Sequence, residues 1–542
     1  MKKHINLILI SLFIGLASVE NIQAQHNQSA LVPMPNHIMQ VKGKSFRVDE
    51  DKTVICLNNK ELDFSAKELQ EMLQETMGVN VETINVSAAS DCKKANSKKN
   101  AIQLLVDPTL GNAQHYSLEV TTKQICIKGA TPQAVFYGIQ TLHQVLTGDY
   151  CATARNEISP IHIEDEPRFA YRALMLDPAR HFLPIKDIKF YIDQMARYKY
   201  NVLQLHLTDD QGWRVEIKSR PELASKEHYT QAELKDLIAY AAQRHIEIVP
   251  EMDIPGHTVA ILAAYPELGC TTADTITKEV GKTVNLMLCA SVDKVYKVYQ
   301  DIFNEMATLF PSKYIHLGGD ESVIEKNWAR CERCQQQMKE RGYTQASQLM
   351  IPFFDKMLGM VERTGKSPIL WCELDNIYPP ANNYLFPYPK NVTLVTWRNG
   401  LTPKCIELTR THGNPLIMAP GEYTYFDYPQ LKGDLPEFNN WGMPITTLQQ
   451  AYAFDPGYGL SAEDQAHIQG VMGTLWGEAM PDINRVTYMT YPRALALAEA
   501  GWTQMGHRSW ESFKERMFPN LYTLMKAGVS IRIPFEIIER KE

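Results

Sequence analysis

Eight short apolar runs, rich in β-branched residues, alternate with longer amphipathic stretches through the second part of this 542-residue chain. Consecutive parallel strands need a long crossover between them, and the crossover is usually a helix. An alternation of this kind therefore predicts a (β/α)8 barrel. The predicted strands are 173–176, 202–207, 246–250, 314–317, 368–371, 392–397, 415–418 and 470–475. Most are separated by segments with a helical spacing of apolar residues, such as 185–198, 231–244, 292–309 and 347–364.

A doubly wound open sheet is the alternative architecture for such an alternation. It is disfavoured because no GxGxxG follows the first strand and no GxxxxGK[ST] occurs anywhere in the chain. We therefore predict an α/β fold in which residues 166–542 form a (β/α)8 TIM barrel. Residues 25–165 mix strand-like and helix-like patterns, such as 116–120 and 134–146, and predict a small α/β domain before the barrel.

The first 24 residues have the pattern of a secretory signal peptide. Lys2 and Lys3 form a positive segment, residues 5–17 are apolar, and small or polar residues lead to a cleavage site after Ala24. The alternative is an N-terminal membrane anchor. It is disfavoured because the apolar run is shorter than the roughly 20 residues that a span needs. We expect the mature protein to be exported, either periplasmic or secreted, without stable membrane insertion.

Charge and cysteine content limit the remaining interpretations. Acidic residues outnumber basic ones by 62 to 55, which disfavours nucleic-acid binding because that usually needs a basic face. Cys331 and Cys334 form a CxxC, but no second CxxC supplies the two further ligands of a zinc site. A local disulfide, free thiols or pairs such as Cys270 with Cys289 remain open. We expect no metal and no cofactor, and the sequence leaves a homodimer open.

Acidic, basic and aromatic residues follow the predicted strands at their carboxyl ends. In a (β/α)8 barrel these ends meet at one face, which is where active sites of this fold lie. Such a concentration is more than structure alone requires, so it predicts an active site at that face. The residues concerned are Arg180, Asp209, Asp253, His257, His316, Asp320, Glu321, Trp371, Trp397, Tyr425, Asp427, Trp476 and Glu478.

The residue types favour a sugar substrate. The apolar faces of a pyranose ring stack on aromatic planes, which Trp371, Trp397 and Trp476 would provide, while acids and arginine bond its hydroxyls. No GxSxG is present, which argues against an α/β-hydrolase. The histidines and aspartates also permit a metal-site interpretation, but no HxxxH or HExxH places two imidazoles on one helical face.

The sharpest motif is HLGGDE at 316–321. Its two glycines let the backbone turn tightly at the end of a strand and admit a ligand closely. Its two adjacent carboxylates, Asp320 and Glu321, must both lie at the mouth of the barrel. Like charges held close together raise one pKa, so the pair predicts one protonated acid and one ionised partner. An acidic loop end without catalytic function is the alternative.

Taken together, the motifs resemble glycoside hydrolase family 20, the β-N-acetylhexosaminidases, over essentially the whole mature chain. The matching segments are PRFAYRALMLDPARHF (167–182), HLTDDQGWR (206–214), PEMDIPGH (250–257), HLGGDE (316–321), TYFD (424–427), LWGE (475–478) and YPRALALAE (491–499). Residues 26–165 resemble the small α/β domain that precedes the family's barrel. The continuation after Trp371, CELDN, is less typical and leaves the leaving-group side of the site open.

The resemblance implies a role for each site residue. Glu321 matches the general acid/base, Asp320 the residue that orients the substrate's 2-acetamido group, and Tyr425 the phenol that bonds the acetamido carbonyl. Arg180 matches the arginine that binds hydroxyls 3 and 4 of the sugar. Asp427 and Glu478 match the acids that bind hydroxyls 4 and 6. The aromatic walls of the site match Trp371, Trp397 and Trp476. Supporting positions fall to Asp209 with His257, and to Asp253 and His316.

The implied function is exo-acting removal of terminal β-linked GlcNAc or GalNAc from glycans or glycoconjugates. In this family the substrate supplies its own nucleophile, the acetamido carbonyl, and an oxazolinium intermediate gives net retention. Glu321 then needs a raised pKa, to which Asp320 would contribute. The alternatives are a disaccharide-releasing relative, similar to a lacto-N-biosidase, and a non-catalytic glycan-binding protein. The choice between GlcNAc and GalNAc stays open.

Overall fold

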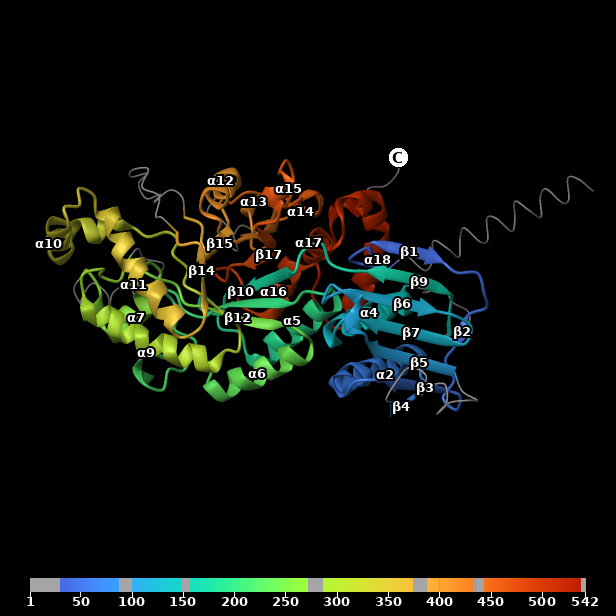
Figure 1. Cartoon of the computed structure of the whole chain (residues 1–542). Helices are drawn as coiled ribbons and strands as arrows, with labels where there is room; N and C mark the ends of the chain where they lie inside the picture. Colours follow the sequence, from blue (N-terminus) through green and yellow to red (C-terminus); the bar gives the residue numbers. More distant parts are fainter. Residues whose placement is uncertain are drawn as a thin grey trace, which may run out of the picture. The chain divides into compact units, whose positions relative to one another are not determined.

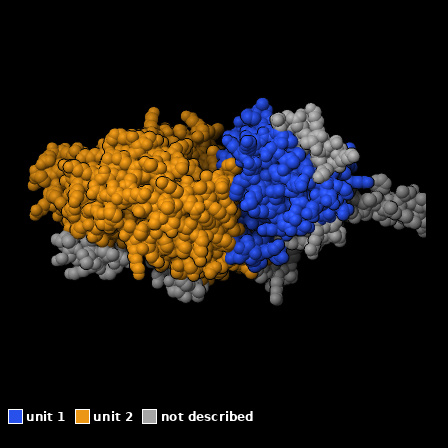
Figure 2. Space-filling view, turned by 90° about the horizontal axis from the view of Figure 1, so that it is seen from below, with its two compact units in different colours: residues 1–168, 197–199, 502–529 blue, residues 169–196, 200–501, 530–542 orange. Residues whose placement is uncertain are grey.

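The computed structural model describes residues 30–86, 100–148, 156–271, 286–373, 388–398, 400–432, 434 and 443–537. The signal-peptide prediction for residues 1–24 lies outside these residues. The chain divides into two compact units, which are coloured separately in Figure 2. Unit 1 comprises Met1–Arg168, Arg197–Lys199 and Trp502–Val529, and unit 2 comprises Phe169–Ala196, Tyr200–Gly501 and Ser530–Glu542. The predicted barrel range of 166–542 thus includes Trp502–Val529, which the structure groups with the N-terminal domain.

Unit 2 is built on a closed barrel of parallel strands (Figure 1), as predicted. Each strand pairs with the next along the chain, and β17 pairs with β10 to close the barrel. The predicted strands agree with the observed ones to within a few residues. The observed strands are β10 (Tyr171–Leu176), β11 (Val202–His206), β12 (Glu247–Glu251), β13 (Tyr314–His316), β14 (Ser367–Trp371), β15 (Thr393–Thr396), β16 (Leu416–Met418) and β17 (Ile468–Leu475).

Long helices of unit 2 lie where helical spacing predicts them. They begin at sequence signals such as the capping box of Thr230 and Glu233. A core of buried apolar side chains from the strands, including Met175, Val249 and Ile417, fills the barrel. The helices are α5 (Ile185–Arg197, whose last residue is assigned to unit 1), α6 (Gln231–Gln243), α7 (Val259–Ala264), α9 (Asp293–Leu309), α10 (Glu332–Arg341), α11 (Met350–Arg363), α12 (Thr402–His412), α13 (Gly421–Thr424), α14 (Leu448–Ala453), α15 (Ala462–Gln465), α16 (Ile483–Thr490) and α17 (Arg493–Trp502, whose last residue is assigned to unit 1).

Unit 1 contains a seven-stranded mixed sheet in the order β1-β9-β6-β7-β5-β3-β4. The helix α4 (Pro132–Thr147) packs on this sheet and contacts both α2 (Asp63–Met77) and the C-terminal helix α18 (Trp510–Lys526). The strands of the sheet are β1 (His37–Gln40), β3 (Thr53–Leu57), β4 (Glu82–Asn85), β5 (Asn100–Val106), β6 (Tyr116–Val120), β7 (Gln124–Gly129) and β9 (Ile161–Asp165), and β2 (Phe46–Arg47) pairs separately with β8 (Glu157–Ile158). A small α/β domain was predicted here, and it is observed. Among the described helices, none is long and apolar enough to cross a bilayer.

The buried carboxylate of Asp165 organises the polar interior of unit 1. It accepts hydrogen bonds from the Tyr116 hydroxyl at 2.7 Å, the Trp502 indole at 2.9 Å and the Asn36 backbone N–H at 3.0 Å. The Lys199 ammonium lies 3.7 Å from it and is itself almost fully buried. Residues that are far apart in the sequence therefore all contact the one buried carboxylate of Asp165.

We predict that Asp165→Ala lowers the free energy of unfolding by about 3–5 kcal/mol, because it leaves the buried charge of Lys199 without its counter-ion. Chemical denaturation of the purified chain measures this loss. Glu82→Ala, on the exposed edge of β4, is the matched control and should leave the midpoint nearly unchanged. Equal stability of Asp165→Ala and the native chain would contradict the role assigned to this carboxylate.

Candidate active site

The predicted site residues all lie at or just after the carboxyl ends of the barrel strands, and the contacts below join most of them into one network. The strand ends of a closed parallel barrel share one face, so residues distant in sequence converge there. Glu251, which accepts a 2.7 Å hydrogen bond from the Trp371 indole, is one such link across the barrel, from β12 to β14.

The turn after β13 depends on its glycines. Gly318 and Gly319 have φ of +64° and +100°, and a Cβ on Gly318 would overlap the carboxylate of Asp253. The Gly319 N–H donates to Asp253 at 3.1 Å, and the Gly318 N–H donates to His316 Nδ1 at 3.0 Å. The backbone can pass this close only without side chains. Glu321 itself has φ of +44°, which sets the direction of its side chain.

A chain of charged groups connects four strand ends. The Arg180 guanidinium lies 2.8 Å from Asp209 and 3.0 Å from Asp177, and the other Asp209 oxygen lies 3.3 Å from His257 Nδ1. His257 Nε2 then lies 3.7 Å from Glu321 and 4.0 Å from Asp320. The predicted supporting pair therefore connects the arginine to the carboxylate pair.

The charges in this chain hold one another ionised. Burial alone would raise the pKa of Asp209, but Arg180 and His257 outweigh it and hold that pKa well below its ordinary value. Burial likewise opposes the charged form of His257, but Asp209 raises the pKa of this imidazole well above 6.5. His257 is thus an imidazolium that faces Asp320 and Glu321.

The carboxylate pair differs from the sequence prediction in one respect. The hydrogen bond from His257 lowers the pKa of Glu321, whereas a raised value was expected. Burial, and secondarily the charge of Glu321, raise the pKa of Asp320 against the opposing effect of His257. The expectation was wrong because the sequence shows the neighbouring carboxylate but not the imidazolium that lies 3.7 Å from Glu321 in space.

Aromatic rings line the site and touch one another. The Trp476 ring centroid lies 5.7 Å from that of Trp371 and 6.4 Å from that of Tyr425, and the Arg180 guanidinium lies 5.0 Å from it. Trp371 is fully buried, whereas Trp397 and Trp476 are partly exposed. The Tyr425 hydroxyl is buried and has no hydrogen-bond partner among the described residues. It therefore offers a free donor to a ligand.

Two further predicted acids lie beside this aromatic group. Asp427 is buried and accepts the Trp476 backbone N–H at 3.5 Å, and Glu478 lies 3.9 Å from Arg180. Burial, together with the charge of Glu478, raises the pKa of Asp427 to about 8. At neutral pH this carboxyl is therefore protonated and can donate a hydrogen bond to a sugar hydroxyl.

Sequence reasoning missed the contact of Glu373 with Arg398 next to the carboxylates. Glu373 pairs with Arg398 at 3.1 Å, and its other oxygen accepts the backbone N–H of Glu321 at 3.4 Å. Burial raises the pKa of Glu373 to about 8 despite Arg398. Both residues follow predicted strand ends, Glu373 two residues after Trp371 and Arg398 directly after Trp397. The same strand-end rule could have identified them.

Comparisons with known proteins identify the family of the chain. A family model described as "Glycosyl hydrolase family 20, catalytic domain" matches residues 169–505, and one described as "Glycosyl hydrolase family 20, domain 2" matches residues 28–166. A beta-hexosaminidase of Akkermansia muciniphila is 38% identical over 446 residues, which cover 78% of this chain and 87% of the relative. A beta-hexosaminidase of Porphyromonas gingivalis is 32% identical over 528 residues, which cover 93% of this chain and 64% of the relative.

A solved structure is similar over both domains. It is the family 20 exo-β-N-acetylglucosaminidase from Vibrio harveyi in complex with N-acetylglucosamine, with a TM-score of 0.78 and 29% identity. The match covers 94% of this chain and 79% of that chain. The chain described here belongs to glycosyl hydrolase family 20 and is a glycosidase. The family and the enzyme class predicted from the motifs are confirmed.

Proposed function

We propose that this glycosidase is an exo-acting β-N-acetylhexosaminidase that removes terminal non-reducing β-linked GlcNAc or GalNAc from glycans. The observation that carries the proposal is that Asp320, Glu321 and Tyr425 all follow barrel strands at the same face, after β13 and β16. Asp320 Oδ1 and the Tyr425 hydroxyl are both buried and lack partners among the described residues, and the Asp320 charge acts on the Tyr425 hydroxyl. An acetamido group satisfies both, because its N–H donates to Asp320 and its carbonyl accepts from Tyr425.

The proposed reaction uses the substrate's own nucleophile. Glu321 donates its proton to the leaving glycosidic oxygen while the acetamido carbonyl attacks the anomeric carbon. Positive charge then develops on the ring and on the acetamido nitrogen, and ionised Asp320 stabilises it. Water, activated by the Glu321 carboxylate, opens the oxazolinium-type intermediate, and two inversions give net retention.

The protonation of Glu321 is coupled to substrate binding in this proposal. In the free chain, His257 lowers the pKa of Glu321, and the side chain of Glu321 is 42% exposed. A sugar that covers this carboxyl removes water from it, which favours its neutral form. The acid is thereby protonated when the glycosidic oxygen is next to it.

Binding of the ring is assigned to the second half of the site. Arg180 is held by Asp177 and Asp209 with its guanidinium beside Trp476, so it can donate to hydroxyls 3 and 4. Asp427 and Glu478 are assigned to hydroxyls 4 and 6, and Trp371, Trp397 and Trp476 to the apolar faces and the acetamido methyl. Release of a disaccharide remains the second candidate, and the product assay below distinguishes it.

We also propose that the chain is exported to the periplasm or the medium. The proposal rests on the charged, apolar and small-residue segments of positions 1–24. The test is the intact mass of the chain recovered from the periplasm or the medium. The mass should correspond to a chain that lacks residues 1–24.

The chain should release nitrophenol from the β-N-acetylglucosaminide and not from the plain β-glucoside. The reason is that the glucoside lacks the acetamido nucleophile. Comparable rates on both substrates would contradict the substrate-assisted mechanism. With a natural oligosaccharide, a monosaccharide product supports exo-hexosaminidase action, and a disaccharide product supports the second candidate.

Glu321→Gln should lower kcat/KM on an N-acetylglucosamine disaccharide by about 10²–10⁴-fold, because the sugar leaving group needs a proton. The loss should be much smaller on an aryl glycoside with an acidic leaving group. Glu325→Gln, in the same loop, is the matched control and should retain activity on both. An equal loss on the two substrates would exclude Glu321 as the proton donor.

Asp320→Asn and Tyr425→Phe should each lower kcat, by roughly 10²–10³-fold, with little change in KM. Their contacts strengthen as charge develops on the acetamido group, so the effect belongs to the transition state. Tyr428→Phe is the control, because this ring packs on Tyr425 at 5.2 Å without an assigned role in the reaction. A change in KM alone would contradict the assignment.

A further inference from the structure

Four cysteines of unit 2 come together away from the residues assigned to the reaction. Cys331 and Cys334 lie at the start of α10, and Cys270 and Cys289 lie in the connection between α7 and α9. All four are free thiols, and one sulfur from each lies within 4.8 Å of the others. The sequence has no second CxxC, but the fold brings the isolated Cys270 and Cys289 next to Cys331 and Cys334.

The distances between the sulfurs fit a tetrahedral metal. Cys289 Sγ lies 3.5 Å from that of Cys334 and 3.8 Å from that of Cys331, and Cys270 Sγ lies 3.9 Å from that of Cys334. Four sulfurs placed tetrahedrally at about 2.3 Å from a zinc ion are about 3.8 Å apart. The sulfurs of a disulfide are only about 2.05 Å apart. The observed spacing therefore excludes formed disulfides among these sulfurs and matches the spacing of four ligands around one ion.

The surroundings of the cluster suit an anionic metal–thiolate centre. Cys289, Cys331 and Cys334 are buried. The Arg333 side chain hydrogen-bonds to Cys331 and places its positive charge beside the sulfurs. The Ser291 backbone N–H bonds to Cys289, and Arg333 also donates to the Gly269 carbonyl at 2.6 Å. Such outer contacts orient thiolates and offset the net negative charge of a zinc with four of them.

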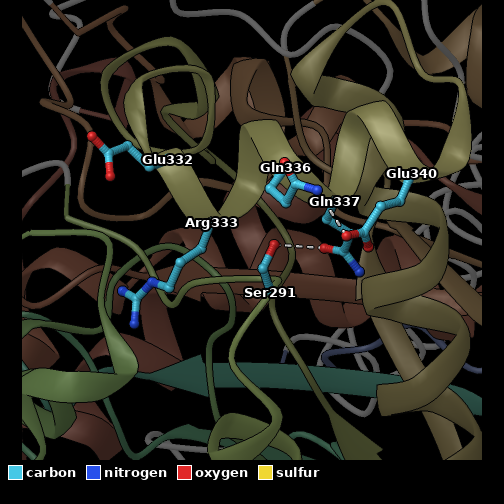
Figure 3. A pocket seen from close by; sticks show the side chains of 6 residues that line it. All are labelled: Ser291, Glu332, Arg333, Gln336, Gln337 and Glu340. Atoms are coloured by element: carbon cyan, nitrogen blue, oxygen red, sulfur yellow. Dashed lines mark hydrogen bonds between the residues drawn. The ribbon is translucent and has the colours of Figure 1, made fainter.

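The backbone around the cluster is already positioned. The Cys289 N–H donates to the Leu268 carbonyl at 2.7 Å, next to an antiparallel bridge between Gly269 and Leu288. Figure 3 shows Ser291 beside α10, where its hydroxyl bonds to Gln337 at 2.6 Å. The Trp328 indole donates to the Leu288 carbonyl at 2.8 Å. These bonds hold the segments that carry the two cysteine pairs against each other.

We propose that Cys270, Cys289, Cys331 and Cys334 bind one structural zinc ion. Four protein ligands leave no open position for water, so the ion takes no part in hydrolysis. It joins the connection after β12, which carries His257, to the connection after β13, which carries Asp320 and Glu321. The zinc thus cross-links the loops whose imidazolium and carboxylates face each other. Two disulfides are the competing use of the same thiols in an exported chain.

The test is the metal content of the full chain, purified without chelator from cells supplied with zinc. We expect one zinc per chain, released when a mercurial reagent titrates the thiols and detected with a metal-binding dye. Replacement by cobalt should produce the intense visible bands of a tetrahedral thiolate complex. A zinc-free chain in which peptide mapping finds Cys270, Cys289, Cys331 and Cys334 joined in two disulfides would overturn the proposal.

Variants give an independent test. Cys289→Ser with Cys334→Ser should abolish zinc binding and lower the melting temperature, whereas Cys126→Ser, in β7 of unit 1, should retain both. If the double variant does not fold, mercurial release from the native chain decides the question. Zinc retained by the folded double variant would overturn the assignment. The metal content is read without any substrate, so its result is independent of the proposed hydrolysis.

Discussion

The carboxylate of Asp209 is the point on which the charges of the barrel mouth depend. It lies 2.8 Å from the guanidinium of Arg180, 2.8 Å from His206 and 3.3 Å from His257. Arg180 follows β10, His206 ends β11 and His257 follows β12, so one buried anion couples these three strand ends. Without Asp209, the buried charges of Arg180 and His257 would lose their closest counter-ion, which is costly in a site screened from water.

That coupling explains why the two adjacent acids behave differently. The imidazolium of His257 is maintained by Asp209, and it in turn keeps Glu321 ionised in the free chain. Asp320 is more deeply buried, so loss of hydration dominates and raises its pKa. Glu373 hydrogen-bonds to Arg398, and its other oxygen accepts the Glu321 backbone N–H. The pKa values of the two adjacent carboxyls are therefore shifted in opposite directions in the free chain.

The cysteine cluster likewise depends on two loops that follow neighbouring strands of the barrel, β12 and β13. The CxxC lies in the connection after β13, which also carries Asp320 and Glu321. The other two cysteines, Cys270 and Cys289, lie in the connection after β12. A proposed zinc at this point would restrain the same two loops that His257 and Glu321 join by charge. The connections after β12 and β13 would then contribute both to the stability of the fold and to the geometry of the proposed active site.

The sequence by itself determined the barrel strands, the α/β domain before them and the residues at the strand ends. These follow from local periodicity and from the fact that the ends of parallel strands share a face. Three features were decided only by the tertiary structure. They are the lowered pKa of Glu321, the Glu373–Arg398 pair and the gathering of four thiols. Each depends on distances between segments far apart in the chain. The same holds for helix α18, which packs with unit 1 although it follows the barrel in sequence. Electrostatic and coordination energies depend on separation in space, and spacing along a chain does not specify that separation.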